Sequence, residues 1–284
     1  QFLYFIGAST MALSSKDPNT QPNVKPVVVP AHLQTPAHRS HSNEDHSERV
    51  EKAAPIIISI EAAIGTGKSS LLRLLENTLG QDKKWVVVQE PVEQWQAIGG
   101  THNLLAAYYD DQQRYAFSFQ TNCVLSRIRA LQDVLRTVSS DTQVIVLERC
   151  WASDRNTFGE MLRRDKKISE LEWALYEEWY QFAVENAPFI DGHVYLEANA
   201  NTCMERLRKR DRTEEVGVTE TYQRALIECH EQWLATLPDS ERVCRLSVDQ
   251  EFITDESNRQ RIVQSVSDFI AQLQEKRTPQ PPVA

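Results

Sequence analysis

Apolar and polar positions follow two alternating patterns along the chain, beginning near residue 53. Short runs rich in β-branched residues are typical of buried strands, and they lie at Ile56–Ile60, Trp85–Gln89, Gln143–Leu147, His193–Leu196 and Val243–Val248. Helical spacing occurs at Ser69–Leu79, at one or more places within Asn103–Val138, and at Ile168–Asn186, Thr202–Arg210 and Asn258–Glu275. This alternation predicts an α/β fold, in which helices cover both faces of a parallel five-stranded sheet.

The two ends of the chain depart from this pattern. Residues 14–51 are rich in Pro, Ser, Asn, Thr and His and have almost no apolar periodicity, so they cannot bury enough surface to offset the entropy of ordering. We therefore interpret residues 1–52 as a disordered extension, residues 53–275 as one folded domain and residues 276–284 as a flexible tail. A targeting segment at the start is an open alternative, although the acidic residues there are unlike a mitochondrial transit peptide.

The composition limits the classes of partner. A net charge of −9 argues against binding of a nucleic acid polymer, which needs a basic face. The five cysteines are scattered and lack C-x-x-C spacing, which argues against a disulfide framework or a structural zinc and favours a reducing intracellular compartment. No apolar run approaches the length that spans a membrane, so no membrane association is expected.

The strand at Ile56–Ile60 leads into a turn with two glycines, Gly65 and Gly67, and then into Lys68-Ser69-Ser70 and a leucine-rich helix. Strand, glycine-bearing loop, Lys-Ser and helix form the context of a phosphate-binding loop, in which backbone N–H groups and the lysine hold phosphates and the hydroxyl ligates magnesium. Ala62 stands where the general pattern has its first glycine. A chance Gly-Lys-Ser on a loop is the alternative.

Charged residues follow two further strands, and ligands bind at the carboxyl ends of parallel strands. Glu90 precedes Pro91, which keeps it extended and ends the strand, while Glu148 and Arg149 directly follow Gln143–Leu147. With the phosphate loop, these residues suggest phosphoryl transfer, in which one carboxylate helps to hold magnesium and another accepts a hydroxyl proton. The alternatives are a solvated turn residue for Glu90 and a local ion pair for Glu148 and Arg149.

The predicted helix Thr202–Arg210 has signals at both ends. Thr202 followed by Glu205 fits a capping box that would start this helix. Four arginines occupy alternate positions at its other end: Arg206, Arg208, Arg210 and Arg212. They form either a basic helix end that complements the macrodipole or a mobile lid that closes over the transferring phosphate. The alternate spacing continues past the helix end and favours the lid.

These residues resemble the deoxyribonucleoside kinase family, a branch of the P-loop kinase fold. The resemblance covers nearly everything from Ile56 to about Phe252 and rests on ordered matches: IEAAIGTGKSS, EPVEQW, NLL…YY…FSFQTN, SRIRA, LERCWASDR, EEWY, RLRKRDRTEE and HEQW. Within the family the chain is most similar to the branch that phosphorylates deoxycytidine and deoxypurine nucleosides. The resemblance implies a kinase domain with an arginine-rich lid, ATP and Mg²⁺ as cofactors, a nucleoside triphosphate donor, and a homodimer packed through helices near Asn103–Val138 and Ile168–Asn186.

The resemblance also assigns roles by position. Glu90 would be the general base, with Lys68 and Arg149 as its catalytic partners, and Ser69 and Glu148 would lie on the magnesium side. ATP would be held by a larger set: Gly65, Thr66, Gly67, Lys68, Ser69, Ser70, Arg206, Arg210, Arg212 and Phe252. The nucleoside would be held by Trp95, Tyr109, Gln120, Arg127, Asp154 and Glu215.

Within the nucleoside set, each residue has its own implied contact. Trp95 would line the sugar and base pocket, Tyr109 and Glu215 would hold the 3′-hydroxyl, and Gln120 would contact the base. Arg127 and Asp154 would form the pair typical of the cytosine- and purine-accepting branch. A solvated helix residue and a helix cap are the alternatives for this pair.

Several positions depart from the family pattern. Ala62 and Ala63 replace Gly and Asn, Cys150 replaces a serine, and Asp211 lies between two lid arginines. A methyl group at position 62 would strain the backbone if φ there were positive. These departures put the reaction rate in doubt more than the identity of the enzyme.

The leading hypothesis is therefore an ATP-dependent deoxynucleoside kinase that makes 5′-monophosphates in nucleotide salvage, with deoxycytidine or a deoxypurine nucleoside preferred. One alternative is a non-catalytic member of the fold that serves as an accessory subunit of a mitochondrial complex. A second alternative is a nucleoside monophosphate kinase, but an acceptor carboxylate suits an uncharged hydroxyl better than a phosphate. The compartment is intracellular, with cytoplasm and mitochondrion undecided.

Overall fold

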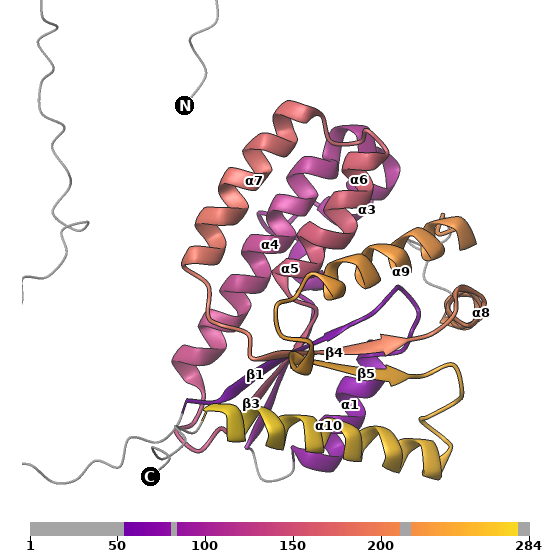
Figure 1. Ribbon diagram of the computed structural model, residues 1–284. Coiled ribbons are helices and arrows are strands. Elements are labelled where there is room, and N and C mark those ends of the chain that lie inside the picture. Colours follow the sequence, from indigo (N-terminus) through magenta and orange to yellow (C-terminus); the bar gives the residue numbers. More distant parts are fainter. Residues whose placement is uncertain (1–53, 81–83, 211–216, 278–284) are drawn as a thin grey trace, which may run out of the picture. The chain divides into compact units, whose positions relative to one another are not determined.

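The computed structural model describes residues 54–80, 84–210 and 217–277, which Figure 1 draws as a coloured ribbon. The predicted N-terminal extension therefore lies outside the described residues, as does most of the predicted tail. Among the helices in these ranges, none combines the length and the apolar character needed to cross a membrane.

Five parallel strands form one sheet in the order β2-β3-β1-β4-β5, which confirms the predicted fold class. The strands are β1 (Ile56–Glu61), β2 (Trp85–Val88), β3 (Val144–Glu148), β4 (Gly192–Glu197) and β5 (Val243–Ser247). Each differs from its predicted range by a single residue at one or both ends. Because β1 lies between β3 and β4, the chain reverses its direction across the sheet beside the end of β1, where such sheets bind ligands.

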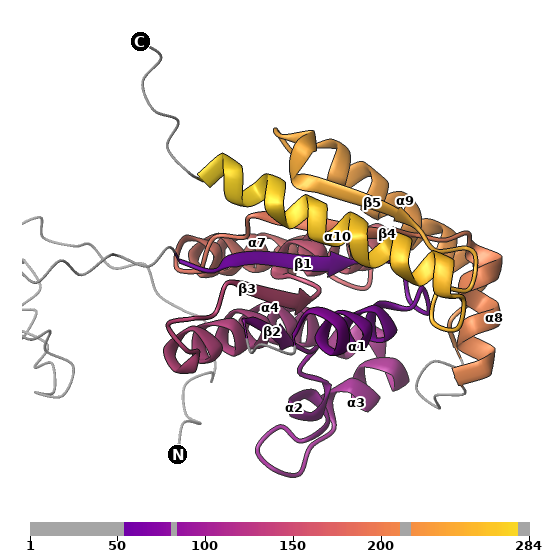
Figure 2. The same cartoon turned by 90° about the horizontal axis from the view of Figure 1, so that it is seen from below.

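Helices precede and follow the strands, and Figures 1 and 2 show them on both sides of the sheet. They are α1 (Lys68–Leu79), α2 (Val92–Gln96), α3 (Leu104–Asp110), α4 (Gln112–Thr137), α5 (Trp151–Ser153), η2 (a π-helix, Asp154–Gly159), α6 (Glu160–Arg164), α7 (Glu170–Glu185), α8 (Ala200–Arg210), α9 (Glu220–Ala235), η4 (a 3₁₀-helix, Ser240–Arg242) and α10 (Glu256–Arg277). The predicted helices correspond to α1, to α3 and α4 together, and to α7, α8 and α10.

The alternation of β1 side chains sends neighbouring residues to opposite faces of the sheet. Ile56, Ile58 and Ile60 join one apolar core, which also contains buried residues of α1 and α10. Ile57 joins a second core with buried residues of α4, α7 and α9. The three central strands β1, β3 and β4 are buried along nearly their whole length, whereas the edge strands β2 and β5 stay partly exposed.

Helix α9 has no counterpart among the predicted helices. Its buried face contains Gln223 and His230 beside Leu226, Trp233 and Leu234. Two polar residues on the buried face weaken the hydrophobic period that reveals a helix in the sequence. The short segments α2, α5 and α6 were also not predicted, because helices of three to five residues carry too little periodicity.

The capping box predicted at Thr202 is wrong. Helix α8 begins at Ala200, and the side-chain oxygen of Asn199 accepts the backbone N–H of Thr202 at 2.9 Å. Asn199 therefore caps the helix, three residues earlier than predicted. The structure does contain a capping box, at the start of α7, where Ser169 and Glu172 each accept a backbone N–H of the other.

The last helix continues two residues past its predicted end at Glu275. Arg277 contacts Asp191 through Nη2 at 2.5 Å and the carbonyls of Ala54 and Pro55 through Nη1 at 2.8 and 3.0 Å. Asp191 in turn accepts the backbone N–H of Ile57 at 2.8 Å. The end of α10 is therefore joined to the start of β1.

Candidate active site

The loop between β1 and α1 depends on its two glycines. Gly65 has φ of +79° and Gly67 has φ of +114°, both in the left-handed region that favours glycine. A Cβ on Gly65 would lie 2.7 Å from the carbonyl oxygen of Cys203 in α8, and one on Gly67 would lie 3.2 Å from the ring of Phe252. Only glycine therefore fits this tight turn, as a loop that brings its backbone close to phosphates requires.

Ala62, which replaces the first glycine of the general pattern, is not strained. The non-glycine residues with positive φ in the described ranges are Arg149 and Lys166. Ala62 is fully buried in the core between the sheet and α1, and Ala63 is buried beside α8 and α9. The φ angle of Ala62 is therefore not positive, and its methyl group does not strain the backbone.

Lys68 lies at the N-terminus of α1 with only 7% of its surface exposed. Its ammonium group donates to the carbonyl of Ala63 at 3.2 Å, and the hydroxyl of Thr66 donates to the same carbonyl at 2.9 Å. Burial, and secondly the nearby Arg149, together lower the pKa of Lys68 to about 7 against the opposing effect of nearby carboxylates. The charged form of Lys68 is therefore destabilised by burial, and a bound anion would stabilise it.

Ser69 and Glu148, the predicted magnesium ligands, lie side by side. The Ser69 hydroxyl donates to Glu148 Oε1 at 2.8 Å, although the two residues come from α1 and from the end of β3. Hydroxyl and carboxylate oxygens are the donors that Mg²⁺ prefers. The pair therefore fits the ion that the sequence predicts there.

Three further residues of the predicted ATP set lie around the loop. Ser70 lines a groove of about 1050 Å³ between α1 and α10. Phe252 is buried and packs against Gly67. The guanidinium of Arg206 donates to the carbonyl of Thr66 at 2.8 Å and to that of Val248 at 2.7 Å. The side chain of Arg210, and all of Arg212 and Glu215, lie outside the described residues.

On the other side of the loop, Arg127 of α4 connects three parts of the chain. Its Nη2 donates to Glu90 at 2.5 Å, its Nε to Asp154 at 2.7 Å, and its Nη1 to the backbone carbonyl of Glu148 at 2.9 Å. Arg127 is buried, so it is not the solvated helix residue of the alternative interpretation, while the buried Asp154 lies at the junction of α5 and η2 with its carboxylate on Arg127. The guanidinium also lies over the ring of Trp95, 5.2 Å from its centre.

The two carboxyl groups that share Arg127 differ in proton affinity. Burial alone would raise the pKa of Glu90, but Arg127 and Arg149 outweigh it and lower the pKa to about 2. At Asp154 burial outweighs Arg127 and raises the pKa to about 6. Glu90 therefore stays ionised at every physiological pH, while Asp154 titrates at mildly acid pH.

Arg149 occupies a strained position directly after β3. Its φ is +62°, in the left-handed region that few non-glycine residues adopt. Its Nε lies 3.7 Å from Glu90, its guanidinium lies over the ring of Phe158, and its buried Nη1 has no partner in the described part of the chain. An unpaired buried N–H donor beside a phosphate loop is suited to an anionic ligand.

An aromatic cluster adjoins this network. Trp95 of α2 contacts Phe119 edge to face, and Phe119 stacks on Tyr108 at a centroid distance of 4.4 Å. Gln120, one residue further along α4, is 2% exposed, and its Oε1 has no partner among the described residues. Tyr109 packs against the same cluster. A buried amide with an unused acceptor next to aromatic rings is suited to a planar polar ligand.

Taken together, the site places a phosphate-binding loop beside an ionised carboxylate and two arginines. A sequence model described as deoxynucleoside kinase matches residues 58–271. The chain belongs to the deoxynucleoside kinase family.

Individual relatives agree with this family. Deoxycytidine kinase 2 of Gallus gallus is 33% identical over 75% of this chain and 89% of its own length. Mitochondrial deoxyguanosine kinase of Xenopus laevis is 35% identical over 62% of this chain and 72% of its own length. Human deoxycytidine kinase is 34% identical over 71% of this chain and 83% of its own length. The chain is thus a phosphotransferase of this family with ATP as donor, and the accessory-subunit alternative is not favoured. Its compartment stays a prediction.

Some residues of this deoxynucleoside kinase site were not found from the sequence. Ser126 accepts a hydrogen bond from the Trp95 indole N–H at 2.9 Å, and the Arg149 guanidinium lies over the ring of Phe158. A serine or a phenylalanine in a sequence does not by itself indicate a functional site. Tyr108 and Phe119 were within quoted family motifs, and the available clue for Phe119 was that it directly precedes Gln120.

Proposed function

We propose that this deoxynucleoside kinase transfers the γ-phosphoryl group of ATP to the 5′-hydroxyl of deoxycytidine or of a deoxypurine nucleoside, in nucleotide salvage. The observation that carries the proposal is the Arg127 network, which joins Glu90, Asp154 and the end of β3 in one unit beside the phosphate loop. The names of the relatives, deoxycytidine and deoxyguanosine kinases, support the choice of base.

Glu90 accepts the proton of the 5′-hydroxyl in this mechanism. Its carboxylate is ionised, 23% of its side chain is exposed to solvent, and Arg127 and Arg149 fix its position. Phosphoryl transfer passes through a loose transition state, for which positioning and charge stabilisation matter more than a strong base. A carboxylate held between two arginines supports such a role.

The phosphate loop holds the donor. Backbone N–H groups from Gly65 to Ser70 and the N-terminus of α1 face the phosphates, and Lys68 and Arg149 stabilise the charge that develops on the transferred group. Ser69 and Glu148 would hold Mg²⁺, which supplies neutralisation of phosphate charge when bound. Arg206, Arg210, Arg212 and Phe252 complete the donor side.

The acceptor pocket selects the nucleoside. Trp95 lines the sugar and base, and Tyr109 with Glu215 holds the 3′-hydroxyl. Gln120 contacts the base through its amide, a role that its buried and unused Oε1 supports. The Arg127–Asp154 pair contacts the exocyclic groups that cytosine and purines present.

The enzyme works as a homodimer in this proposal. Helices α4 and α7 lie side by side (Figure 1) and expose large apolar side chains: Leu125, Leu171, Trp179 and Phe182. Leu171 and Phe182 are 72% and 71% exposed. Apolar side chains gathered on one surface are typical of a subunit interface. Sedimentation of the intact chain measures the oligomeric state.

The test is phosphorylation of each of the four natural deoxynucleosides with ATP and Mg²⁺, in the wild type and in Glu90→Gln. We expect turnover of deoxycytidine or a deoxypurine nucleoside, reduced about 10²–10⁴-fold by Glu90→Gln. Glu93→Gln is the matched control, because Glu93 lies exposed on the adjacent helix α2. Turnover of thymidine alone would contradict the base assignment, and equal loss in both variants would contradict the role of Glu90.

A further inference from the structure

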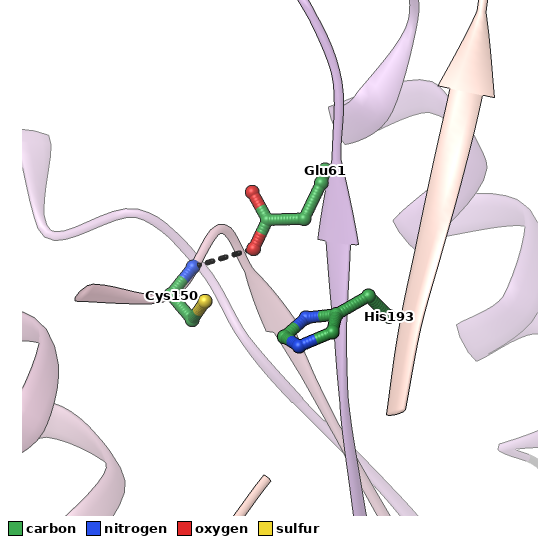
Figure 3. Close-up of side chains that lie close together, drawn as sticks. All are labelled: Glu61, Cys150 and His193. Carbon is green, nitrogen blue, oxygen red and sulfur yellow. Dashed lines mark hydrogen bonds between the residues drawn. The ribbon is translucent and has the colours of Figure 1, made fainter. Parts of the chain in front are cut away.

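Three side chains with metal-binding atoms meet beneath the site, and the proposed mechanism uses none of them. They are Glu61 at the end of β1, Cys150 two residues after β3, and His193 near the start of β4. One donor atom of each lies within 4.8 Å of the others, and all three residues are at most 9% exposed. Figure 3 shows the carboxylate, the sulfur and the imidazole directed toward one another.

The sheet register explains why these residues converge. His193 is the register partner of Ser59, which lies two residues before Glu61 on the same face of β1. The Cys150 N–H donates to Glu61 Oε1 at 2.9 Å, which brings the sulfur to this face from the other neighbouring strand. The three ligands therefore come from β1, β4 and the turn after β3, and no short sequence spacing such as C-x-x-C could reveal them.

The cluster is incomplete without a cation. Glu61 has no exposed surface, its Oε2 has no hydrogen-bond partner, and no ion pair reaches it within the described ranges. Glu61 Oε1 accepts the Cys150 N–H, but a buried carboxylate whose second oxygen is unpaired is costly unless a cation or a proton compensates it. A divalent metal ion would balance both the Glu61 carboxylate and a Cys150 thiolate, leaving a neutral complex.

A further contact orients the imidazole. Ser59 Oγ lies 2.8 Å from His193 Nδ1, and the ring packs edge to face against Trp233 at a centroid distance of 5.3 Å. Metal-binding histidines usually donate one ring N–H to a neighbouring acceptor, which fixes the ring and leaves the other nitrogen for the metal.

We propose that Glu61, Cys150 and His193 bind one divalent metal ion of the zinc class. Thiolate, imidazole and carboxylate together are a zinc ligand set. The oxygen pair Ser69 and Glu148 suits magnesium instead, so the two sites differ in chemistry. The metal ties β1, β4 and the strained turn at Arg149 together, and thereby helps to hold Arg149 in place. This inference does not depend on the proposed substrate.

Cobalt(II) spectroscopy on the intact chain tests the site. The protein is stripped with a chelator under reducing conditions, saturated with Mg²⁺ and equilibrated with Co²⁺. We expect about one equivalent of Co²⁺ to bind with a thiolate-to-cobalt charge-transfer band in the near ultraviolet, and Zn²⁺ to remove the band and raise the melting temperature. Absence of the band in the folded wild type would overturn the proposal.

Two variants and a control make the test specific. Cys150→Ser should abolish the charge-transfer band, and His193→Gln should lower the Zn²⁺ affinity by more than about 100-fold, beyond the usual effect of losing an outer-shell partner. Cys229→Ser is the matched control, because Cys229 is a buried cysteine on α9 outside the cluster. A band that persists in Cys150→Ser, or unchanged affinity in folded His193→Gln, would reject the site.

Discussion

The phosphate-loop side of this site (the donor side) and the Arg127 side (the acceptor side) position charged groups in different ways. On the donor side, Gly65 and Gly67 shape a backbone loop, and Lys68 donates to the carbonyl of Ala63 within that loop. On the acceptor side, Arg127 is bonded to Glu90 and Asp154, which lie 37 and 27 residues away in the chain. The donor side is thus a local backbone structure, while the acceptor side is a network of buried charges.

This difference implies different costs of alteration. A buried ion pair that loses one member leaves an uncompensated charge, so the acceptor network should serve stability as well as catalysis. The donor lysine is a buried cation whose pKa has fallen to about 7, so the free protein gains little from it. We expect variants on the acceptor side to lose both stability and activity, and Lys68 variants to lose activity alone.

The largest effect on stability should come from Arg127→Met. It leaves Glu90 and the buried Asp154 without their shared cation, and we expect a loss of about 3–5 kcal/mol in unfolding free energy, measured by urea denaturation. Arg129→Met is the matched control, since Arg129 lies exposed two residues further along α4. A loss below about 1 kcal/mol in Arg127→Met would show that the network contributes little to the fold.

The two sides also differ in how far the sequence could predict them. Strand, turn, Lys-Ser and helix follow one another between Ile56 and Leu79, so local periodicity was enough to place the phosphate loop. On the acceptor side, residue-by-residue reasoning reached only the charged residues at strand ends, and family resemblance was needed to suggest Arg127 and Asp154. Their contact depends on how α4 packs against the end of β3, which no local pattern encodes.

Other features were beyond the sequence for similar reasons. The positive φ of Arg149 arises where the chain leaves the sheet, held by the bonds from its own N–H to Ile60 and from Cys150 to Glu61. Helix α9 buries Gln223, whose amide donates to the carbonyl of Ile64 at 2.7 Å. A polar residue that is buried because it binds a distant backbone group looks exposed when only its neighbours in sequence are considered.

Lys68→Met should separate activity from stability. We expect a loss of about 10²–10³-fold in kcat/KM, typical of removing one charge-stabilising donor, with an unfolding free energy at pH 7 no lower than that of the wild type. Since the pKa of Lys68 is about 7 in the folded protein and 10.5 ordinarily, wild-type stability should rise relative to the variant between those pH values. Destabilisation of Lys68→Met comparable to that of Arg127→Met would remove the distinction between the two sides.

Gly65→Ala should test whether the donor side depends on backbone shape. The new Cβ would lie 2.7 Å from the Cys203 carbonyl at a φ of +79°, and we expect a loss of about 1–3 kcal/mol in stability with weaker ATP binding. Gly99→Ala is the control, because Gly99 also has positive φ but no neighbour within 4 Å of its added Cβ. Thermal melts with and without ATP measure both effects, and equal losses in the two variants would attribute them to φ rather than to the contact with α8.

The smallest effect concerns the proton on Asp154. Because its pKa is raised to about 6, protonation below that pH removes one charge partner of Arg127, while Glu90 with its pKa of about 2 stays ionised. We expect kcat/KM to fall as the pH drops through about 6, and Asp154→Asn to lack this acid limb while having lower activity throughout. The folded protein binds more protons at Asp154 than the unfolded chain does between pH 4 and 6, so the wild type should gain stability relative to Asp154→Asn as the pH falls across that range. An acid limb that persists near pH 6 in Asp154→Asn would assign it to another group and would place the acid sensitivity outside the Arg127 network.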